Sequence, residues 1–245
     1  MQVISARPKS MKDTVTHYCP GCGHGIVHRI ICEIVDELDI REKLVGVCPV
    51  GCSVVAYNYF DFDMVEAAHG RAPAVATGIK RALPDRVVFT YQGDGDLASI
   101  GMAEIIHAAA RGESFTVIFI NNATYGMTGG QMAPTTLLGQ RTATSPFGRK
   151  AELEGYPIKI PELLASLPGA YYLERVSVHS PSHIRRTKKA IKKAFLLQIE
   201  KGKFSLIEIL SPCPTCWGLS PLDALKWIEE YMIPYYPLKV VKEGN

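Results

Sequence analysis

Residues 86–122, RVVFTYQGDGDLASIGMAEIIHAAARGESFTVIFINN, decide the fold of this chain. Two short apolar runs, 86–91 and 115–121, flank a glycine-rich turn and a segment, 98–111, whose apolar residues recur with helical spacing. This order predicts a β-α-β unit. Because such units form parallel sheets with helices on both faces, we expect an α/β fold built on a doubly wound, mostly parallel sheet.

The rest of the chain continues this alternation. Apolar spacing predicts further helices at 25–38, 72–83, 161–167, 182–201 and 221–231, and further strands at 44–48, 171–176 and 204–210. The segment 123–157 has nine glycines and prolines and no clear period, so we expect a long loop of the kind that is usually functional or disordered. No repeat or linker divides the chain, and residues 1–245 are expected to form one domain.

Composition indicates a globular protein without a membrane span. The chain has 245 residues, of which 47% are hydrophobic and 21% charged, with a net charge of +3. No apolar run approaches the roughly 18 residues that a span needs, and the N-terminus lacks the apolar core of a secretory signal. We therefore expect a cytoplasmic protein. Eight Lys and Arg residues in 181–203, against one Glu, are most typical of a solvated helix face, with docking of an acidic partner protein or a subunit contact as the alternative. No nucleic-acid site is indicated.

Polar residues stand at the ends of two of the expected strands. The turn Gly93–Asp96 (GDGD) follows one strand, and Asn121–Asn122 ends the next. Carboxyl ends of parallel strands share one edge of a sheet, so both groups can contact one ligand. Carboxylate and amide oxygens suit Mg²⁺, and glycines let backbone N–H groups approach a phosphate. The pattern predicts a magnesium-bound diphosphate, although turn and capping residues have the same composition.

Asp94 within Gly93-Asp94-Gly95, followed 28 residues later by Asn122, resembles the thiamine diphosphate fingerprint. By that resemblance Asp94, Asn122 and the carbonyl of Thr124 hold Mg²⁺ against the diphosphate, and the fold is that of a thiamine diphosphate-binding (diphosphate) domain. The wider motifs are HGR at 69–71, GDGDLASIG at 93–101 and NNATYGMTGGQMAPTT at 121–136. Together, over about residues 17–217, they resemble the β subunit of a 2-oxoacid:ferredoxin oxidoreductase.

Seven cysteines in a chain without an export signal argue against a disulfide framework. Cys32 stands alone on an apolar helical segment and is expected in the core, whereas the other six lie in close pairs. Four thiolates serve structural Zn²⁺ and an iron-sulfur cluster equally well, and buried thiols without metal are a further alternative. The spacing by itself does not choose among these.

The family resemblance implies a 4Fe-4S cluster. Its ligands in this sequence would be Cys19 and Cys22 of the CPGC run, Cys52 and Cys213. Cys48 and Cys216 are additional to the family pattern, and either can replace an assigned ligand.

Further residues are assigned to the cofactor by the same resemblance. His69 is the candidate catalytic residue, and Arg71 beside it can pair with Asp94, Asp96 or an anionic substrate. His24 is expected to cap a helix or support the site. The complete set expected at the thiamine diphosphate is Cys52, Ser53, His69, Gly93, Asp94, Gly95, Asp96, Asn122, Thr124, Gly126, Met127 and Thr128.

The resemblance implies coenzyme A-dependent oxidative decarboxylation of a 2-oxoacid, with electrons passing through the cluster to ferredoxin. Val54 and Val55 favour a branched-chain substrate, while 2-oxoglutarate and pyruvate stay open. In this family the glutamate that activates the cofactor comes from a second domain, so the chain would need an α subunit with the pyrimidine domain, and small γ and ferredoxin-like δ subunits. The alternatives are the diphosphate domain of a non-oxidative thiamine enzyme and a non-enzymatic metal-binding scaffold.

Overall fold

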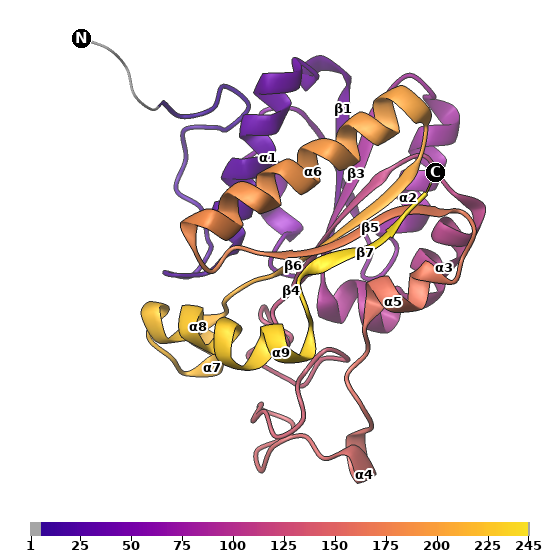
Figure 1. Ribbon diagram of the computed structural model, residues 1–245. Coiled ribbons are helices and arrows are strands. Elements are labelled where there is room, and N and C mark those ends of the chain that lie inside the picture. Colours follow the sequence, from indigo (N-terminus) through magenta and orange to yellow (C-terminus); the bar gives the residue numbers. More distant parts are fainter. Residues whose placement is uncertain (1–5, 245) are drawn as a thin grey trace.

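The computed structural model describes residues 6–244, and a seven-stranded sheet runs through them in the order β2-β1-β3-β4-β6-β5-β7 (Figure 1). Residues 1–5 and 245, which the expected domain includes, lie outside the described residues. Neighbouring strands are parallel except β5 and β7, which are antiparallel. The strands are β1 (Leu44–Pro49), β2 (Asp63–Ala67), β3 (Val87–Gly93), β4 (Thr116–Asn121), β5 (Ala170–Ser177), β6 (Phe204–Leu210) and β7 (Lys239–Glu243).

Helices cover both faces of the sheet. One face carries α1 (His24–Leu38) and α6 (Pro181–Lys201), and the other carries α2 (Ala72–Ala82), α3 (Met102–Arg111) and α5 (Ile160–Ala165) (Figure 1). Shorter helical elements are η1 (Arg41–Lys43), η2 (Val54–Asn58), η3 (Asp96–Ile100), α4 (Ala151–Glu154), α7 (Pro214–Trp217), α8 (Pro221–Trp227), η4 (Ile228–Met232) and α9 (Ile233–Tyr235). The expected doubly wound, mostly parallel α/β architecture is confirmed.

Apolar spacing located the central elements and missed the two edge strands. β2 and β7 have mostly exposed side chains, so their sequences lack the apolar run that marks a buried strand. The expected helix at 98–111 is divided, because the π turn η3 precedes α3 and Gly101 stands between them.

The strand order leaves a crevice at one edge of the sheet. After β1 the chain moves outward to β2 and then returns to the other side of β1 to form β3. The connections that leave β1 and β3 therefore run in opposite directions, and a crevice opens between their carboxyl ends. Residues 50–53 and 94–96 enter this crevice, one group from each strand.

The long connection after β4 follows the expectation of an irregular loop, with α4 as its one helix. The backbone of this loop surrounds Arg149, a residue that is only 5% exposed. The guanidinium donates to six backbone carbonyls, those of Ala133, Pro134, Thr136, Glu154, Gly155 and Tyr156. A single side chain thus supplies hydrogen bonds that a regular element would make within itself.

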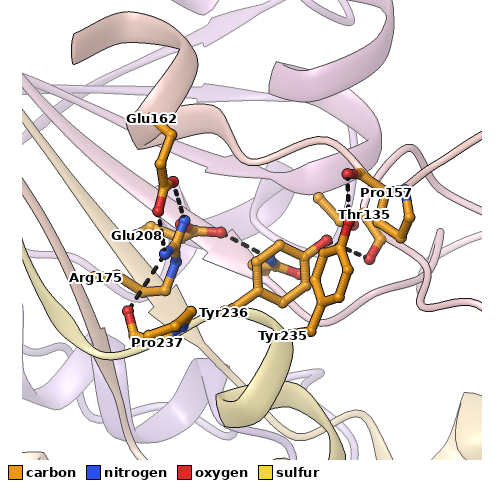
Figure 2. A network of polar contacts seen from close by, with 9 residues as sticks. Thr135, Pro157, Glu162, Arg175, Glu208, Tyr235, Tyr236 and Pro237 are labelled. Carbon is orange, nitrogen blue, oxygen red and sulfur yellow. Dashed lines mark hydrogen bonds and ion pairs between the residues drawn. The ribbon is translucent and has the colours of Figure 1, made fainter.

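A buried ion pair joins β5 and β6 (Figure 2). Arg175 lies opposite Glu208 in the strand register, and its Nε donates to Glu208 Oε2 at 2.6 Å. Its other two nitrogens donate to Glu162 of α5 at 2.9 and 2.6 Å. Glu208 Oε1 accepts from Nδ2 of Asn121, the last residue of β4, at 2.7 Å. The ion pair therefore fixes the backbone at the point where β4 enters the crevice.

We predict that Arg175→Met lowers the free energy of unfolding by about 3–5 kcal/mol, since it leaves the Glu208 carboxylate buried without its cation. Chemical denaturation monitored by circular dichroism measures the change. Adding Glu208→Gln to Arg175→Met should recover part of the loss, because the amide is neutral and still accepts from Asn121. A single variant as stable as the wild type would contradict this account of the pair.

Candidate functional site

At one edge of the sheet, a motif residue follows the carboxyl end of each of five parallel strands. Cys52 follows β1, His69 follows β2, Asp94 follows β3, Asn122 follows β4 and Cys213 follows β6. Since the carboxyl ends of parallel strands lie together, residues far apart in the sequence meet there. This convergence is the one that the sequence predicted for the GDGD turn and the asparagine pair, and it extends to the cysteines.

A cavity of about 110 Å³ lies in the crevice between β1 and β3. Its lining includes every residue expected at the cofactor except Ser53, together with His24, Val50, Gly51 and Tyr125. The Ser53 hydroxyl is buried and donates to the backbone carbonyl of Tyr91 at 2.7 Å, which gives it a supporting place behind the cavity. Val54 and Val55, from which a branched-chain substrate was inferred, lie in η2 outside the lining; the apolar side chain that lines the cavity from this segment is Val50.

Three oxygen atoms converge in this cavity. The side-chain oxygen of Asn122, as oriented, lies 2.7 Å from the carbonyl oxygen of Thr124 and 3.3 Å from Oδ1 of Asp94. Turning the amide over would place its NH₂ group there and form two hydrogen bonds. With the oxygen inward, the three atoms have the chemical character of ligands of a hard cation. The donor set therefore fits Mg²⁺.

Asp94 is held from behind by a residue that the sequence did not single out. Thr135 Oγ1 donates to Asp94 Oδ2 at 2.6 Å, while the backbone N–H of Gly95 donates to Oδ1 at 2.9 Å. Burial raises the pKa of Asp94 to about 7, and these hydrogen bonds oppose the rise. Tyr236 in turn donates to the Thr135 carbonyl at 2.7 Å (Figure 2). Thr135 belongs to the motif at 121–136, but no spacing rule marks it as a partner of Asp94.

Asp96 ties the HGR motif to the glycine-acid turn. Its carboxylate accepts from the backbone N–H of Gly70 and from Gln92 Nε2, both at 2.6 Å, and His69 Nε2 lies 3.6 Å from it. Gly70 has a φ of +78°, and a Cβ there would come within 2.7 Å of the backbone nitrogen of Gly101. The motif therefore brings His69 to the cavity by close backbone packing.

Arg71 does not pair with Asp94 or Asp96. Its guanidinium forms an ion pair with Glu104 of α3, which lies on the face of the sheet covered by α2 and α3. This contact anchors the start of α2 to α3. Arg71 therefore forms its ion pair outside the cavity and not with Asp94 or Asp96.

A second cavity of about 150 Å³ adjoins the first and collects five of the seven cysteines. They are Cys19, Cys22, Cys52, Cys213 and Cys216. All four assigned ligands are thus brought together, with Cys216 as a fifth thiol whose Sγ donates to the Gly126 carbonyl at 3.4 Å. Cys48 is completely buried among the core residues of β1 and does not line the cavity, so its proposed use as a substitute ligand is not supported. Cys32 is likewise fully buried, as expected.

Three of the thiols around this cavity are poorly hydrated, whereas Cys19 is exposed. Burial raises the pKa of Cys22 to about 11 and that of Cys52 to about 12, and it raises the pKa of Cys213 further. Thiols in this environment stay protonated at neutral pH unless a cation replaces the protons. Within residues 6–244, no group of three His, Cys, Asp or Glu side chains is close enough to hold a single metal ion.

The two cavities share a wall. Cys52, Asn122, Gly126 and Met127 line both of them. A Cβ on Gly126 would lie 3.2 Å from Cys52 Sγ and 3.6 Å from Cys213 Sγ, so the absence of a side chain at this position keeps the thiols accessible to one another. Thr128 and Met127 lie on the same loop, which the backbone pair Tyr125–Gln131 closes.

His24 lines the first cavity and is held by a hydrogen bond from behind it. It begins α1, its side chain is buried, and its Nδ1 lies 2.7 Å from the hydroxyl of Tyr91. Burial lowers its pKa to about 3, so the ring is neutral. This agrees with the expected supporting role.

The basic helix α6 is partly neutralised by α1. Lys188 Nζ lies 2.7 Å from both Glu33 and Glu37, and Lys192 Nζ lies 2.8 Å from Glu37. These pairs use part of the positive charge within the chain and leave the choice between a solvated face and a docking surface open.

Among the described helices, none is long and apolar enough to cross a membrane.

Comparison with known proteins agrees with this geometry. Residues 49–209 match the family described as thiamine pyrophosphate enzyme, C-terminal TPP binding domain. The chain is 53% identical over 232 residues to the ketoisovalerate oxidoreductase subunit VorA of Methanothermobacter thermautotrophicus, an alignment that covers 95% of this chain and 49% of the relative. It thus spans about half the length of that relative.

Other relatives are matched over most of their length. The chain is 40% identical to the 2-oxoglutarate synthase subunit KorB of Archaeoglobus fulgidus, covering 88% of this chain and 76% of the relative. A solved 2-oxoglutarate:ferredoxin oxidoreductase from Magnetococcus marinus, with 2-oxoglutarate, coenzyme A and succinyl-CoA bound, superposes with a TM-score of 0.82 at 26% identity over 100% of this chain and 87% of the other. The chain belongs to the thiamine pyrophosphate enzyme family, and within it to the subunits of 2-oxoacid:ferredoxin oxidoreductases.

Proposed function

We propose that this chain is the subunit of a 2-oxoacid:ferredoxin oxidoreductase that binds both thiamine diphosphate and a 4Fe-4S cluster. In the assembled enzyme it would take part in the coenzyme A-dependent oxidative decarboxylation of a 2-oxoacid. The observation that carries the proposal is the pair of adjacent cavities, one lined by converging oxygens and the other by thiols, with Cys52 and Gly126 in their common wall. Residues 1–245 would act in it as one domain.

Asp94, Asn122 and the Thr124 carbonyl would hold Mg²⁺, which neutralises the diphosphate. The backbone of the Gly93–Asp96 turn and the residues Gly126, Met127 and Thr128 would surround the diphosphate itself. A cation would also favour the ionised form of Asp94, against the effect of burial on its pKa. Bound there, thiamine diphosphate supplies the electron sink for decarboxylation. His69, which lines the same cavity and is held through Asp96 and Gly70, is the candidate to move a proton at the substrate.

Cys19, Cys22, Cys52 and Cys213 would bind the cluster. In a 4Fe-4S cluster each iron takes one thiolate, so its ligands stand farther apart than the ligands of a single ion. This favours the cluster over structural Zn²⁺, because no three of the described His, Cys, Asp or Glu side chains are close enough together to bind one ion. Binding would replace the protons that burial keeps on Cys22, Cys52 and Cys213. Cys216 lines the same cavity and is the alternative to Cys213.

The cofactor cavity supports a requirement for a partner subunit. No glutamate is among its lining residues, whereas the family resemblance assigns the activating glutamate to the pyrimidine domain of an α subunit. Val50 and Met127 at the cavity are 44% and 48% exposed, which is high for large apolar side chains beside a reactive centre. An α subunit would cover them and exclude water; γ and ferredoxin-like δ subunits would complete the electron path to ferredoxin.

For the substrate we propose a branched-chain 2-oxoacid. Its support is the higher identity to the ketoisovalerate oxidoreductase subunit, 53%, than to the 2-oxoglutarate synthase subunit, 40%. The apolar Val50 in the cavity is consistent with it.

A protein of this composition would work in the cytoplasm.

We expect the anaerobically purified complex of this chain with its partner subunits to contain thiamine diphosphate, magnesium, iron and acid-labile sulfide. Cys22→Ala should remove about four iron and four sulfide per chain, because one 4Fe-4S cluster is lost. Cys48→Ala is the matched control and should keep them, since that thiol is buried outside the cavity. The complex should oxidise 3-methyl-2-oxobutanoate when coenzyme A accepts the acyl group and ferredoxin accepts the electrons, and the single chain should not.

The cofactor and metal content of the purified complex also separates the alternative functions. Thiamine diphosphate with no iron lost in Cys22→Ala would point to a non-oxidative thiamine enzyme. Zinc without thiamine diphosphate would point to a metal-binding scaffold. Equal turnover by the isolated chain and the complex would remove the case for an α subunit.

Thr135→Val should weaken Mg²⁺-dependent binding of thiamine diphosphate by about tenfold, because Asp94 loses the hydrogen bond that orients its carboxylate. Isothermal titration at fixed Mg²⁺ measures the affinity. Thr135→Ser keeps the hydroxyl and should bind nearly as well as the wild type. If both variants bind alike, the hydroxyl does not orient the carboxylate.

Gly126→Ala should lower the iron and sulfide content of the purified complex, since the added methyl group would lie 3.2 Å from Cys52 Sγ. Gly25→Ala is the control, because a Cβ there has no neighbour within 4 Å. Both proteins are to be compared at equal folded fraction by circular dichroism. Full iron content in Gly126→Ala would show that the shared wall tolerates a side chain.

A further inference from the structure

Tyr18 presents a buried hydroxyl that has no hydrogen-bond partner among the described residues. The residue precedes Cys19 in the sequence and lines the cavity that collects the five thiols. A buried hydroxyl without a partner destabilises the fold, so its position calls for an acceptor that the protein chain itself does not supply. The five cysteines are the largest group of one residue type around the cavity.

The ring of Tyr18 is held in place from two sides. It stacks on His24 with a centroid distance of 5.1 Å and an interplanar angle of 10°, and its edge meets Tyr59 at 5.8 Å and 66°. The preceding residue, His17, is fixed by its backbone N–H and Nδ1, which lie 3.0 and 2.9 Å from the Tyr59 hydroxyl. The chain on either side of the ring thus keeps its hydroxyl at the cavity.

The Tyr18 hydroxyl is available only as a donor of its proton, not as an acid. Burial raises the pKa of this phenol. Two of the assigned ligands, Cys22 and Cys52, line the same cavity as Tyr18. A protonated phenol facing thiolate sulfur has the polarity of a hydrogen-bond donor to it.

We propose that the Tyr18 hydroxyl donates a hydrogen bond to a sulfur of the cluster site and thereby raises the reduction potential of the cluster. The inference rests on the proposed function, because it needs a cluster bound by Cys22 and Cys52. Reduction adds one electron and one negative charge, and a donor hydrogen bond stabilises the more negative state. The phenol keeps its proton throughout. Tyr18 is thus a tuning residue for electron transfer from the thiamine cavity.

The test is the midpoint potential of this cluster in the full complex with Tyr18→Phe. The signal is followed by electron paramagnetic resonance during redox titration and is assigned as the one that disappears in Cys22→Ala. We expect the one-electron reduction equilibrium to become about tenfold less favourable, which is a shift of about 59 mV to lower potential. Tyr57→Phe is the matched control, because that side chain is exposed and does not line the cavity.

The outcomes are distinct. An unchanged potential in Tyr18→Phe, or an equal shift in Tyr57→Phe, overturns the proposal. Should Tyr18→Phe not retain the cluster, Tyr18→3-fluorotyrosine keeps the ring and makes the hydroxyl a stronger donor; a higher potential supports the proposal and an unchanged one refutes it. A wild-type complex without iron and sulfide would instead refute the proposed function.

Discussion

The buried guanidinium of Arg175 is the constraint on which this edge of the fold depends. An arginine with no exposed surface loses its hydration, and the loss is offset only if several acceptors stand in the correct positions. Here they come from β6, α5 and the segment before β7, through Glu208, Glu162 and the Pro237 carbonyl. The elements that meet at Arg175 therefore cannot shift independently, and the C-terminal segment is fixed to the sheet.

That constraint reaches the site by two routes. In the first, Glu208 uses its second oxygen for Asn121, so the strand end is fixed one residue before Asn122 enters the cavity. In the second, the ring of Tyr236 lies 5.3 Å from the guanidinium, and its hydroxyl binds the carbonyl of Thr135, whose side chain orients Asp94. Two of the three converging oxygens are thus positioned from the same buried charge. A small cation needs its ligands in fixed positions, and contacts within the protein interior fix these two oxygens.

The sequence predicted the parts of this site that follow from local pattern. Apolar periods located the central strands, and polar residues at the ends of parallel strands must share an edge, so the meeting of Asp94 with Asn122 could be anticipated. Thr135, Arg149 and Tyr18 could not be, because each acts through a contact between segments that no spacing rule relates. The choice between Cys48 and Cys216 is of the same kind. Both lie near an assigned ligand, but Cys48 belongs to a strand covered on both faces, while Cys216 lies on the short helix α7 beside the cavity.

The common wall has a further consequence for how such an enzyme must work. Under the proposed function, electrons that leave a cofactor in the first cavity would need to cross only the residues that line both cavities, chiefly Cys52 and Gly126, which has no side chain. A short path to a one-electron carrier is useful only while water and oxidants are kept from the donor, yet Met127 in that same wall is 48% exposed. If both proposed cofactors bind, the geometry that brings oxidation close to decarboxylation would also make the site dependent on a covering surface. Electron transfer and subunit assembly would then be linked through one loop, residues 122–131, and a change there would be expected to affect both.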